Sequence, residues 1–529
     1  MKKYIIAAAL VLMSFWNLKA QSIYDAELFT NKELSGTARF VGMGGAMGAL
    51  GADISTMGVN PAGVGLYRSN DFNIGFGYTN TEVKSDYEGS KFTDDKNRFN
   101  MPNLGFVIST QMGYSGLKYL NFGFNYTRAK DFNSNMQMGG LLNSTLNGQI
   151  VSIADFMSSQ ANAMFDHGID VAGMIDPEPP KSPEPLYSYS DVGWMGALGY
   201  DGALIEATND GYSSSVRTRP NSYFQSHARG GIDQYDFNVS GNVSDRFFFG
   251  LTIGAYDINY RRYTYYDEDY GYNQYSYLKT NREVDGSGVD FKFGAIFRPM
   301  ESSPFRIGLA IHTPVFYNLK QYQNAFFETN LSATGETEPG SNSIISINPN
   351  GDLDNYDHET DFDLRTPWKF NFSLGHNIGD FLAIGAEYEL QDYSSMKFSY
   401  DDGGSMSFYN SSASMLKTVH TMRLGLEYRI VPEFAFRAGY NFQTSAFDKD
   451  AFNDIPLNST QTDVQYANNK SRNTFTMGLG YAGKMFYADL GFKFDWYKSD
   501  FRPFDDTELN FTKLTTNRSQ ILLTLGMRL

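Results

Sequence analysis

Segments of about ten residues with alternating apolar and polar side chains recur through this chain, and no other feature restricts its fold as strongly. In residues 382–391 an apolar row, Leu382, Ile384, Ala386, Tyr388 and Leu390, alternates with a small or polar row, Ala383, Gly385, Glu387, Glu389 and Gln391. A strand has this pattern when one face meets lipid and the other faces a polar interior. Aromatic residues make up 16% of the chain although its mean hydropathy is −0.39, so ring-bearing rows are too many for one soluble sandwich core. The pattern predicts an all-β, transmembrane antiparallel barrel.

The predicted barrel has about fourteen strands, because fourteen segments of this kind can be counted. They span 71–81, 101–111, 118–128, 232–243, 246–260, 284–298, 304–320, 359–376, 380–399, 415–430, 433–445, 470–482, 485–500 and 515–529. Every second connection is short, and the others are long. Outer-membrane barrels place short turns in the periplasm and long loops outside. An even strand number puts both barrel ends in the periplasm, so we expect the outer membrane of a Gram-negative bacterium.

The N-terminus reads as a secretory signal peptide, residues 1–20. Lys2 and Lys3 precede an apolar stretch, residues 5–16, that is too short to span a bilayer, and cleavage is expected after Ala20. The chain has no cysteine, which suits an exported protein and excludes disulfides, thiolate metal sites and cysteine nucleophiles. Its net charge of −16 argues against nucleic acid as a partner and fits solvated outer loops.

Residues 21–68, before the first strand, do not alternate. Their glycine-rich part, residues 37–51, lacks the preceding strand and the following Lys-Ser/Thr of a phosphate-binding loop, so the glycines are expected to allow tight packing. We predict that this segment folds inside the barrel as a hatch and that 69–529 forms the barrel. The candidate hatch and anchor residues are Gly42, Gly44, Gly45, Asn60, Pro61 and Ala62.

The longest predicted loop, residues 129–231, contains two apolar patches. Apolar residues between Leu141 and Met157 recur at the three-to-four spacing of an amphipathic helix, five prolines follow in 176–185, and a second patch covers 192–205. The loop is read as a cap that buries its own apolar face or as an exposed groove that collects a ligand, and the two readings are compatible. The candidate ligand-binding residues are Phe156, Met157, Phe165, Trp194 and Met195.

The sequence offers no catalytic site. Its six histidines form no pair at metal-ligand spacing, and the acidic run 266–270 is read as a solvated loop in preference to a Ca²⁺ site. No enzyme activity, cofactor or metal is therefore expected.

Four motifs resemble the FadL/TodX family of outer-membrane transporters for hydrophobic compounds. The Asn-Pro-Ala of residues 60–62 follows the glycine-rich stretch, residues 288–299 and 305–315 resemble a middle hairpin of the family, and residues 436–440 resemble its Arg-Ala-Gly-Tyr strand. The resemblance runs from about residue 35 to the C-terminus apart from most loops. It implies a hatch-plugged barrel that carries long-chain fatty acids or aromatic compounds and releases them sideways into the membrane.

Two other functions remain open at this stage. Inward rows carry charged residues, as in a solute-selective porin: Arg423, Glu427, Arg429, Arg437, Asp489, Lys493 and Asp495. A surface antigen or adhesin would use only the loops. The expected partners are a hydrophobic small molecule, outer-membrane lipid and lipopolysaccharide, and the barrel-assembly machinery, with the protein acting as a monomer.

Overall fold

The computed structural model describes residues 22–113, 116–144, 148–175, 186–332, 342–353, 357–449, 451, 455–463 and 466–529. The predicted signal peptide, 1–20, and the proline-rich spacer, 176–185, lie outside the described residues. Within the described part, no helix is both long and apolar enough to cross a membrane.

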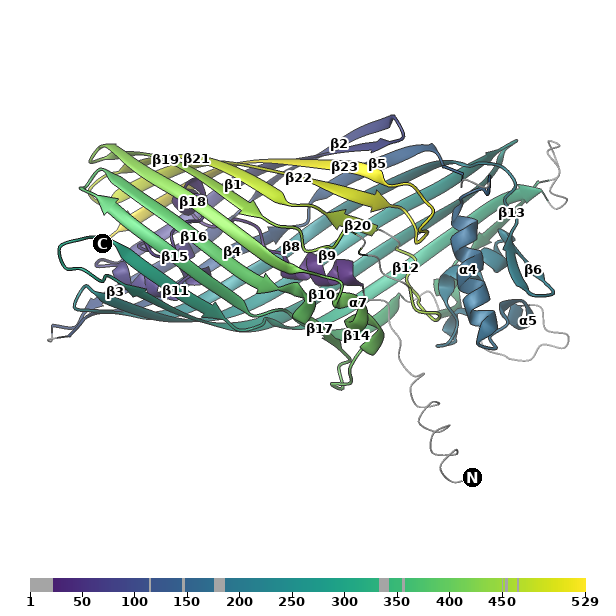
Figure 1. Ribbon diagram of the computed structural model, residues 1–529, viewed down its shortest axis with the longest axis horizontal. Coiled ribbons are helices and arrows are strands. Elements are labelled where there is room, and N and C mark those ends of the chain that lie inside the picture. The colour runs from purple at the N-terminus through teal and green to yellow at the C-terminus, as the bar shows by residue number, and fades with distance from the viewer. Residues whose placement is uncertain are drawn as a thin grey trace, which may run out of the picture.

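The strands form one closed antiparallel barrel of 14 strands, which confirms the predicted fold (Figure 1). The first and last strands close it, with Asp71 opposite Arg528 and Asp86 opposite Lys513. The wall consists, in order, of β1 (Asp71–Tyr87), β2 with β3 (Ser90–Asn100, Asn103–Gln111), β4 with β5 (Leu117–Asp131, Ser134–Leu141), β8 (Asn221–Val243), β9 (Phe247–Gly271), β10 (Gln274–Phe297), β11 with β12 (Arg306–His312, Phe316–Ser332), β14 with β15 (His358–Arg365, Lys369–Ile378), β16 with β17 (Leu382–Asp392, Lys397–Ser399), β18 (Thr418–Val431), β19 (Phe434–Gln443), β20 with β21 (Tyr466–Asn469, Arg472–Ala482), β22 (Phe486–Arg502) and β23 (Thr512–Arg528).

Prolines explain three of the interruptions within wall strands. Pro102 lies between β2 and β3, Pro314 between β11 and β12, and Pro367 between β14 and β15. Proline has no N–H to donate to a neighbouring strand, so the ladder stops at each of them.

The alternation in sequence becomes an outer and an inner face. On β9, Phe247, Phe249, Leu251 and Ile253 are exposed on the outside, whereas the residues between them are buried toward the lumen. Inward charges are paired: Arg437 Nε lies 2.7 Å from Glu427 and its Nη1 lies 2.6 Å from Asp489. Charged lumen positions are therefore stabilised inside a crowded barrel by ion pairs across neighbouring strands.

The N-terminal hatch lies inside the lumen, as predicted. It contains α2 (Ile23–Thr30), α3 (Ala38–Gly42) and the 3-10 helices η2 (Ile54–Gly58) and η3 (Pro61–Leu66). Helix α2 begins at a capping box, in which the Ser22 hydroxyl accepts from the Asp25 N–H and the Asp25 carboxylate accepts from the Ser22 N–H.

The long loop folds at the end of the barrel opposite the C-terminus (Figure 1). It contains α4 (Ile153–Asp166), α5 (Val171–Ile175), η4 (Leu186–Ser188), α6 (Trp194–Asp201) and the hairpin β6–β7 (Ile205–Thr208, Gly211–Ser214). The prediction of a helix from Leu141 was wrong. Residues 134–141 pair with β8 as β5, and α4 starts only at Ile153, where Ser152 caps it.

Other outer segments add β13 (Asn342–Ile347), η5 (Pro349–Leu353), η6 (Tyr393–Ser395) and α7 (Ser407–Ala413). Helix α7 contributes Tyr409 to a buried cluster that includes Phe29 of α2. The hatch therefore also contacts helix α7, which lies between β17 and β18 in the chain.

Candidate functional site

The hatch lies in a belt of glycines that face the lumen. At eleven glycines of the described wall, each on a different strand, an added Cβ would come within 4 Å of a hatch atom. They are Gly105, Gly123, Gly250, Gly294, Gly308, Gly375, Gly385, Gly425, Gly439, Gly478 and Gly491. The missing side chains leave the space that the hatch backbone fills, so the lumen is closed at this level.

The tightest part of this glycine belt contacts the glycine-rich stretch of the hatch. A Cβ on Gly385 would overlap the carbonyl oxygen of Ala46, and one on Gly425 would overlap that of Met43. Gly44 and Gly45 have φ values of +62° and +78°, which non-glycine residues rarely adopt. Gly42 lies against Gly478 of β21, with its carbonyl accepting from the Thr476 hydroxyl at 3.1 Å.

Asn60, Pro61 and Ala62 lie where the hatch meets β9 and β10. Fully buried Asn60 accepts from the Ala62 N–H at 3.2 Å and donates from Nδ2 to the carbonyl of Ala295 on β10 at 3.3 Å. Pro61 packs against the inner sides of Gly250 and Gly294, and Ala62 contacts Phe248 and Ile296. This geometry suits the predicted role of Asn60 as an anchor, which remains a prediction.

Replacing Asn60 with alanine should reduce uptake of a hydrophobic probe several-fold while the barrel still assembles. The change removes two hydrogen bonds, and each contributes about 1 kcal/mol to holding this turn. Whole-cell uptake of labelled hexadecanoate measures the effect. Asn259→Ala is the matched control, because Asn259 bonds Asp285 on the outer face. Normal uptake in Asn60→Ala would mean that the turn has no mechanical role.

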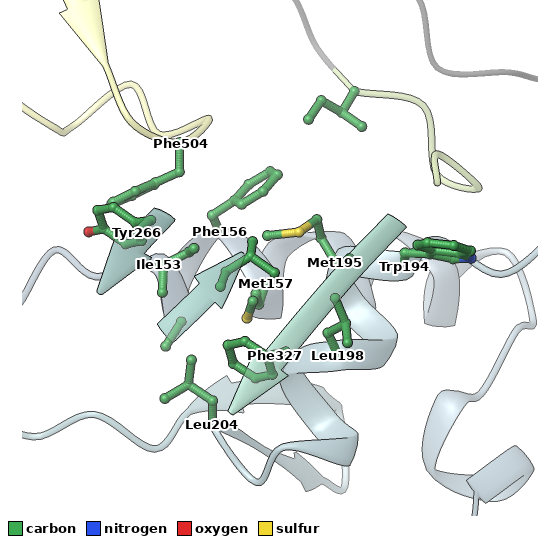
Figure 2. Close-up of a cluster of buried hydrophobic side chains, with 14 of the residues drawn as sticks. Ile153, Phe156, Met157, Trp194, Met195, Leu198, Leu204, Tyr266, Phe327 and Phe504 are labelled. Carbon is green, nitrogen blue, oxygen red and sulfur yellow. The ribbon is translucent and has the colours of Figure 1, made fainter. Parts of the chain in front are cut away.

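The apolar residues of the long loop form the core of a cap, not an exposed groove (Figure 2). Phe156, Met157, Trp194 and Met195 are each at most 3% exposed, and only Phe165 is partly open at 37%. Of the two alternatives, burial therefore favours the self-packed cap, and ligand binding by these residues stays a prediction. The loop packs against inward residues at the outer ends of the strands, such as Phe327 and Tyr266, and this contact removes its apolar face from water.

A buried carboxylate holds the cap to the wall. Glu268 of β9 accepts from the Ser152 hydroxyl at 2.5 Å, the Ile153 N–H at 2.8 Å and the Tyr266 hydroxyl at 2.6 Å. The first two donors lie at the start of α4, where the helix dipole favours an anion. The acidic run 266–270 is thus part of a strand, not the solvated loop that we expected, and no group of side chains among the described residues could hold a metal ion.

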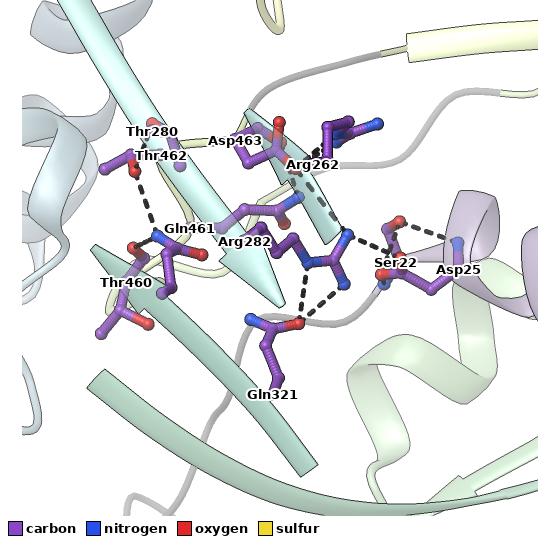
Figure 3. Close-up of polar contacts among 11 residues, drawn as sticks. Ser22, Asp25, Arg262, Thr280, Arg282, Gln321, Thr460, Gln461, Thr462 and Asp463 are labelled. Atoms are coloured by element: carbon purple, nitrogen blue, oxygen red, sulfur yellow. Dashed lines mark hydrogen bonds and ion pairs between the residues drawn. The ribbon is translucent and has the colours of Figure 1, made fainter. Parts of the chain in front are cut away.

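A polar network joins the cap to the hatch (Figure 3). In the segment 455–463, the Ser459 carbonyl accepts from the Trp194 N–H at 2.9 Å, and Asp463 accepts from Arg262 Nε at 2.8 Å. Arg282 Nη1 lies 2.8 Å from Asp25 of α2 and 4.0 Å from Asp463. The side chains of Arg282, Asp25 and Asp463 are almost fully buried. Their ion-pair cluster connects the hatch to the segment 455–463, which in turn contacts the cap.

A cavity of about 220 Å³ lies inside the barrel between helix α2 of the hatch and the inner side of the wall. Tyr24, Leu28, Phe132 and other apolar residues form part of its wall, together with several charged side chains. Arg472 borders this cavity and two smaller ones; it contacts the ring of Tyr497 at 4.9 Å and forms no ion pair with the described residues. Arg472 thus lacks the direct ion pair that the cavity's Arg262, Arg282 and Arg518 each have.

The cavity borders a seam in the barrel wall. Over the described residues, β2 has backbone pairing with β1 alone, whereas β4 pairs with β3 and β8, and β5 with β8. Side chains bridge the seam: Arg98 donates to Asn133 at 3.1 Å and Gln137 to Asp94 at 2.9 Å. Residues 131–134 line the cavity on the inner side. The seam can open without breaking a β-ladder.

Sequence reasoning missed Arg282 and Arg472, because inward arginines alternate like any other lumen residue, and it missed Asp463 because that residue lies in an irregular segment between strands. A signal for the glycine belt did exist. Gly385, Gly425 and Gly439 each occupy the inward row of an alternating segment, where a small residue leaves room for a plug.

Comparisons with known proteins agree with this architecture. Residues 267–508 match the family model described as outer membrane protein transport protein (OMPP1/FadL/TodX). No curated protein matches the chain by sequence.

The solved structures that match have low sequence identity to the chain. A FadL homologue of Pseudomonas aeruginosa has 11% identity and a TM-score of 0.51, with 94% of this chain and 99% of that chain covered. The toluene transporter TodX of P. putida has 11% identity, a TM-score of 0.47 and coverage of 94% and 99%. TbuX, the toluene transporter of Ralstonia pickettii, has 13% identity, a TM-score of 0.47 and coverage of 94% and 98%. The chain is therefore similar to the family OMPP1/FadL/TodX over residues 267–508, and it shares the fold of the FadL homologue.

Proposed function

We propose that this protein carries hydrophobic small molecules across the outer membrane through a plugged barrel with lateral release. The observation that carries the proposal is the internal cavity, which is lined by the first part of the hatch and by wall residues 131–134 that border the seam beside β2. In this proposal residues 21–68 act as the hatch, 69–529 as the barrel, and 129–231 contribute the cap.

The seam supports lateral release because an apolar solute leaves it directly into lipid. Burial of each CH₂ contributes about 0.8 kcal/mol, so a long chain that had to enter periplasmic water would lose most of its binding energy. Outward Phe99 and Met101, at the inner end of β2, offer apolar contact beside the seam. The proposed transport involves no chemical step.

The cavity supports an amphipathic ligand with an anionic head. Arg472 and Lys130 both line it without an ion-pair partner among the described residues; Lys130 donates to the Leu28 carbonyl at 2.7 Å. The carboxylate of Glu27 also lines the cavity and accepts from Asn31 at 2.6 Å. Arg472 and Lys130 carry two positive charges without an ion pair, and Glu27 carries one negative charge without an ion pair. This excess of one positive charge favours a ligand with one negative charge, such as a long-chain carboxylate, over a neutral hydrocarbon.

Uptake in a host that lacks its own transporter of this class tests the proposal. Cells producing the protein should take up labelled hexadecanoate faster than empty cells, and Arg472→Met should lower this rate severalfold through loss of a charge-assisted contact. Arg472→Met should leave toluene uptake unchanged, because toluene has no charge to bind.

The control is Arg261→Met, which removes an arginine that pairs with Glu283 and Asp285 on the outer face. If neither hexadecanoate nor toluene enters faster than in empty cells, although the barrel is folded, transport of hydrophobic compounds is disproved. A porin would instead admit small sugars in a liposome-swelling assay, which the plugged barrel should not do.

A further inference from the structure

The outer face of the barrel carries an aromatic surface far from the lipid-facing band. On β9, the exposed apolar residues end at Ile253, and the outward positions Asp257, Asn259 and Arg261 are polar before Tyr263 and Tyr265 appear. On β10, the outward apolar residues end at Val289, and polar positions 287, 285, 283 and 281 follow before Lys279 and Tyr277. Contact with lipid therefore does not account for these rings.

The outward residues of four neighbouring strands form a checkerboard of rings and polar groups, here called the outer aromatic patch. One row across β8, β9, β10 and β12 is Tyr223, Asp267, Tyr277 and Glu328, and the next row is Gln225, Tyr265, Lys279 and Phe326. Each ring thus has a carboxylate, amide or ammonium group directly opposite on a neighbouring strand.

The rings of the outer aromatic patch lie in contact along a continuous line. The centroids of Tyr223 and Tyr265 are 6.4 Å apart, those of Tyr265 and Tyr277 are 5.6 Å apart, and those of Tyr277 and Phe326 are 6.0 Å apart. Lys279 Nζ lies 4.6 Å above the Tyr277 ring. The rings are partly exposed, and the Lys279 side chain that covers Tyr277 and Phe326 is itself partly exposed on the outer face.

We propose that the outer aromatic patch binds the sugar chain of an outer-leaflet glycolipid. A pyranose ring has a face of C–H groups that stacks on an aromatic ring and a rim of hydroxyls that hydrogen-bonds carboxylates, amides and ammonium groups. The checkerboard offers both kinds of group at the spacing of adjacent strands, about 5 Å. Exposed aromatic surface of this kind marks an interaction site on a protein.

The position of the patch identifies this occupant. Protein in the outer membrane passes first through the lipid and then through the layer of sugars attached to outer-leaflet lipids. The outer aromatic patch lies beyond the polar band that follows the lipid-facing residues, which is the level of that sugar layer. The proposal is independent of transport, because the patch faces away from the lumen cavity.

Saturation-transfer NMR with purified protein in micelles tests the proposal. The probe is the soluble core oligosaccharide released from lipopolysaccharide by mild acid. Saturation should reach its ring protons, and Tyr265→Ile with Tyr277→Ile should weaken the signal about fivefold or more. Isoleucine keeps the strand preference and apolar packing, so the sheet is retained. The single variant Tyr277→Ile should give an intermediate signal.

The matched control is Tyr126→Ile with Tyr235→Ile, which removes another outward ring pair, 5.5 Å apart, beside the lipid-facing band. It should leave the oligosaccharide signal unchanged, and lipid A, which lacks the core sugars, should not displace the oligosaccharide. The proposal is overturned if the unmodified protein transfers no saturation, if the Tyr265/Tyr277 variant gives an unchanged signal, or if lipid A competes.

Discussion

Replacing Gly385 and Gly425 together with valine should open the barrel to ions, with a conductance increase of roughly tenfold or more, because a barrel this wide without a plug holds an aqueous channel. Both Cβ positions are occupied by hatch backbone, namely the carbonyl oxygens of Ala46 and Met43. Valine is favoured in strands, so the wall should remain intact and the hatch should be displaced. Planar-bilayer recording measures the change.

Gly478→Ala is the control for this experiment. Its added Cβ would find its nearest neighbours, Arg437 and Leu490, at 3.4 Å, which is ordinary contact. It should conduct like the unmodified protein. The folded state of each variant is checked by the heat-dependent shift in gel mobility. A folded Gly385→Val, Gly425→Val protein that stays closed would show that the glycine belt does not position the hatch.

The second large effect is expected from Arg282→Met. This change leaves Asp25 and Asp463 buried with a lost partner, and breaking a buried pair in this way costs about 3–5 kcal/mol. Helix α2 should separate from the wall, so hydrogen exchange of residues 23–30 should speed up by roughly a hundredfold or more if it follows local opening. Residues 38–66 should keep their protection, because the glycine belt holds them.

Arg261→Met is the appropriate control here too, since Arg261 pairs with Glu283 and Asp285 on the outer face. It should leave exchange of residues 23–30 unchanged. Equal protection of α2 in Arg282→Met and the unmodified protein would refute the view that Arg282 joins cap and hatch. The two variants also separate the parts of the hatch: the glycine double variant releases 38–61, whereas Arg282→Met releases α2.

The strand pattern was predictable because it is local. Alternation with period two shows in any ten-residue segment, and the lengths of connections give the orientation. The same reasoning placed residues 21–68 in the lumen, since a small, non-alternating segment before the first strand has no place in the wall. The breaks at Pro102, Pro314 and Pro367 were not predicted, because the predicted strands 101–111, 304–320 and 359–376 include these prolines.

The role of the apolar cap residues was not predictable. Trp194 and Met157 have the same sequence pattern whether they face a ligand or each other, and only the inward residues at the outer ends of the strands decide that they are buried. The helix before Ile153 failed for a related reason. Leu141 pairs with Asn221 of β8 and Ser144 forms a bridge with Ile150, so these extended partners override the helical spacing before Ile153.

The sequence by itself determined the class of fold, the number of strands and the presence of a plug, because these follow from periodicity and from the non-alternating segment before the first strand. Only the tertiary structure decided which residues close and connect the compartments. Asp25, Arg282 and Asp463 are far apart in the chain, and eleven glycines on eleven strands become one belt only when the barrel closes. Such sites form where residues of distant strands come together. The pattern within a single strand does not specify which residues of other strands lie beside it.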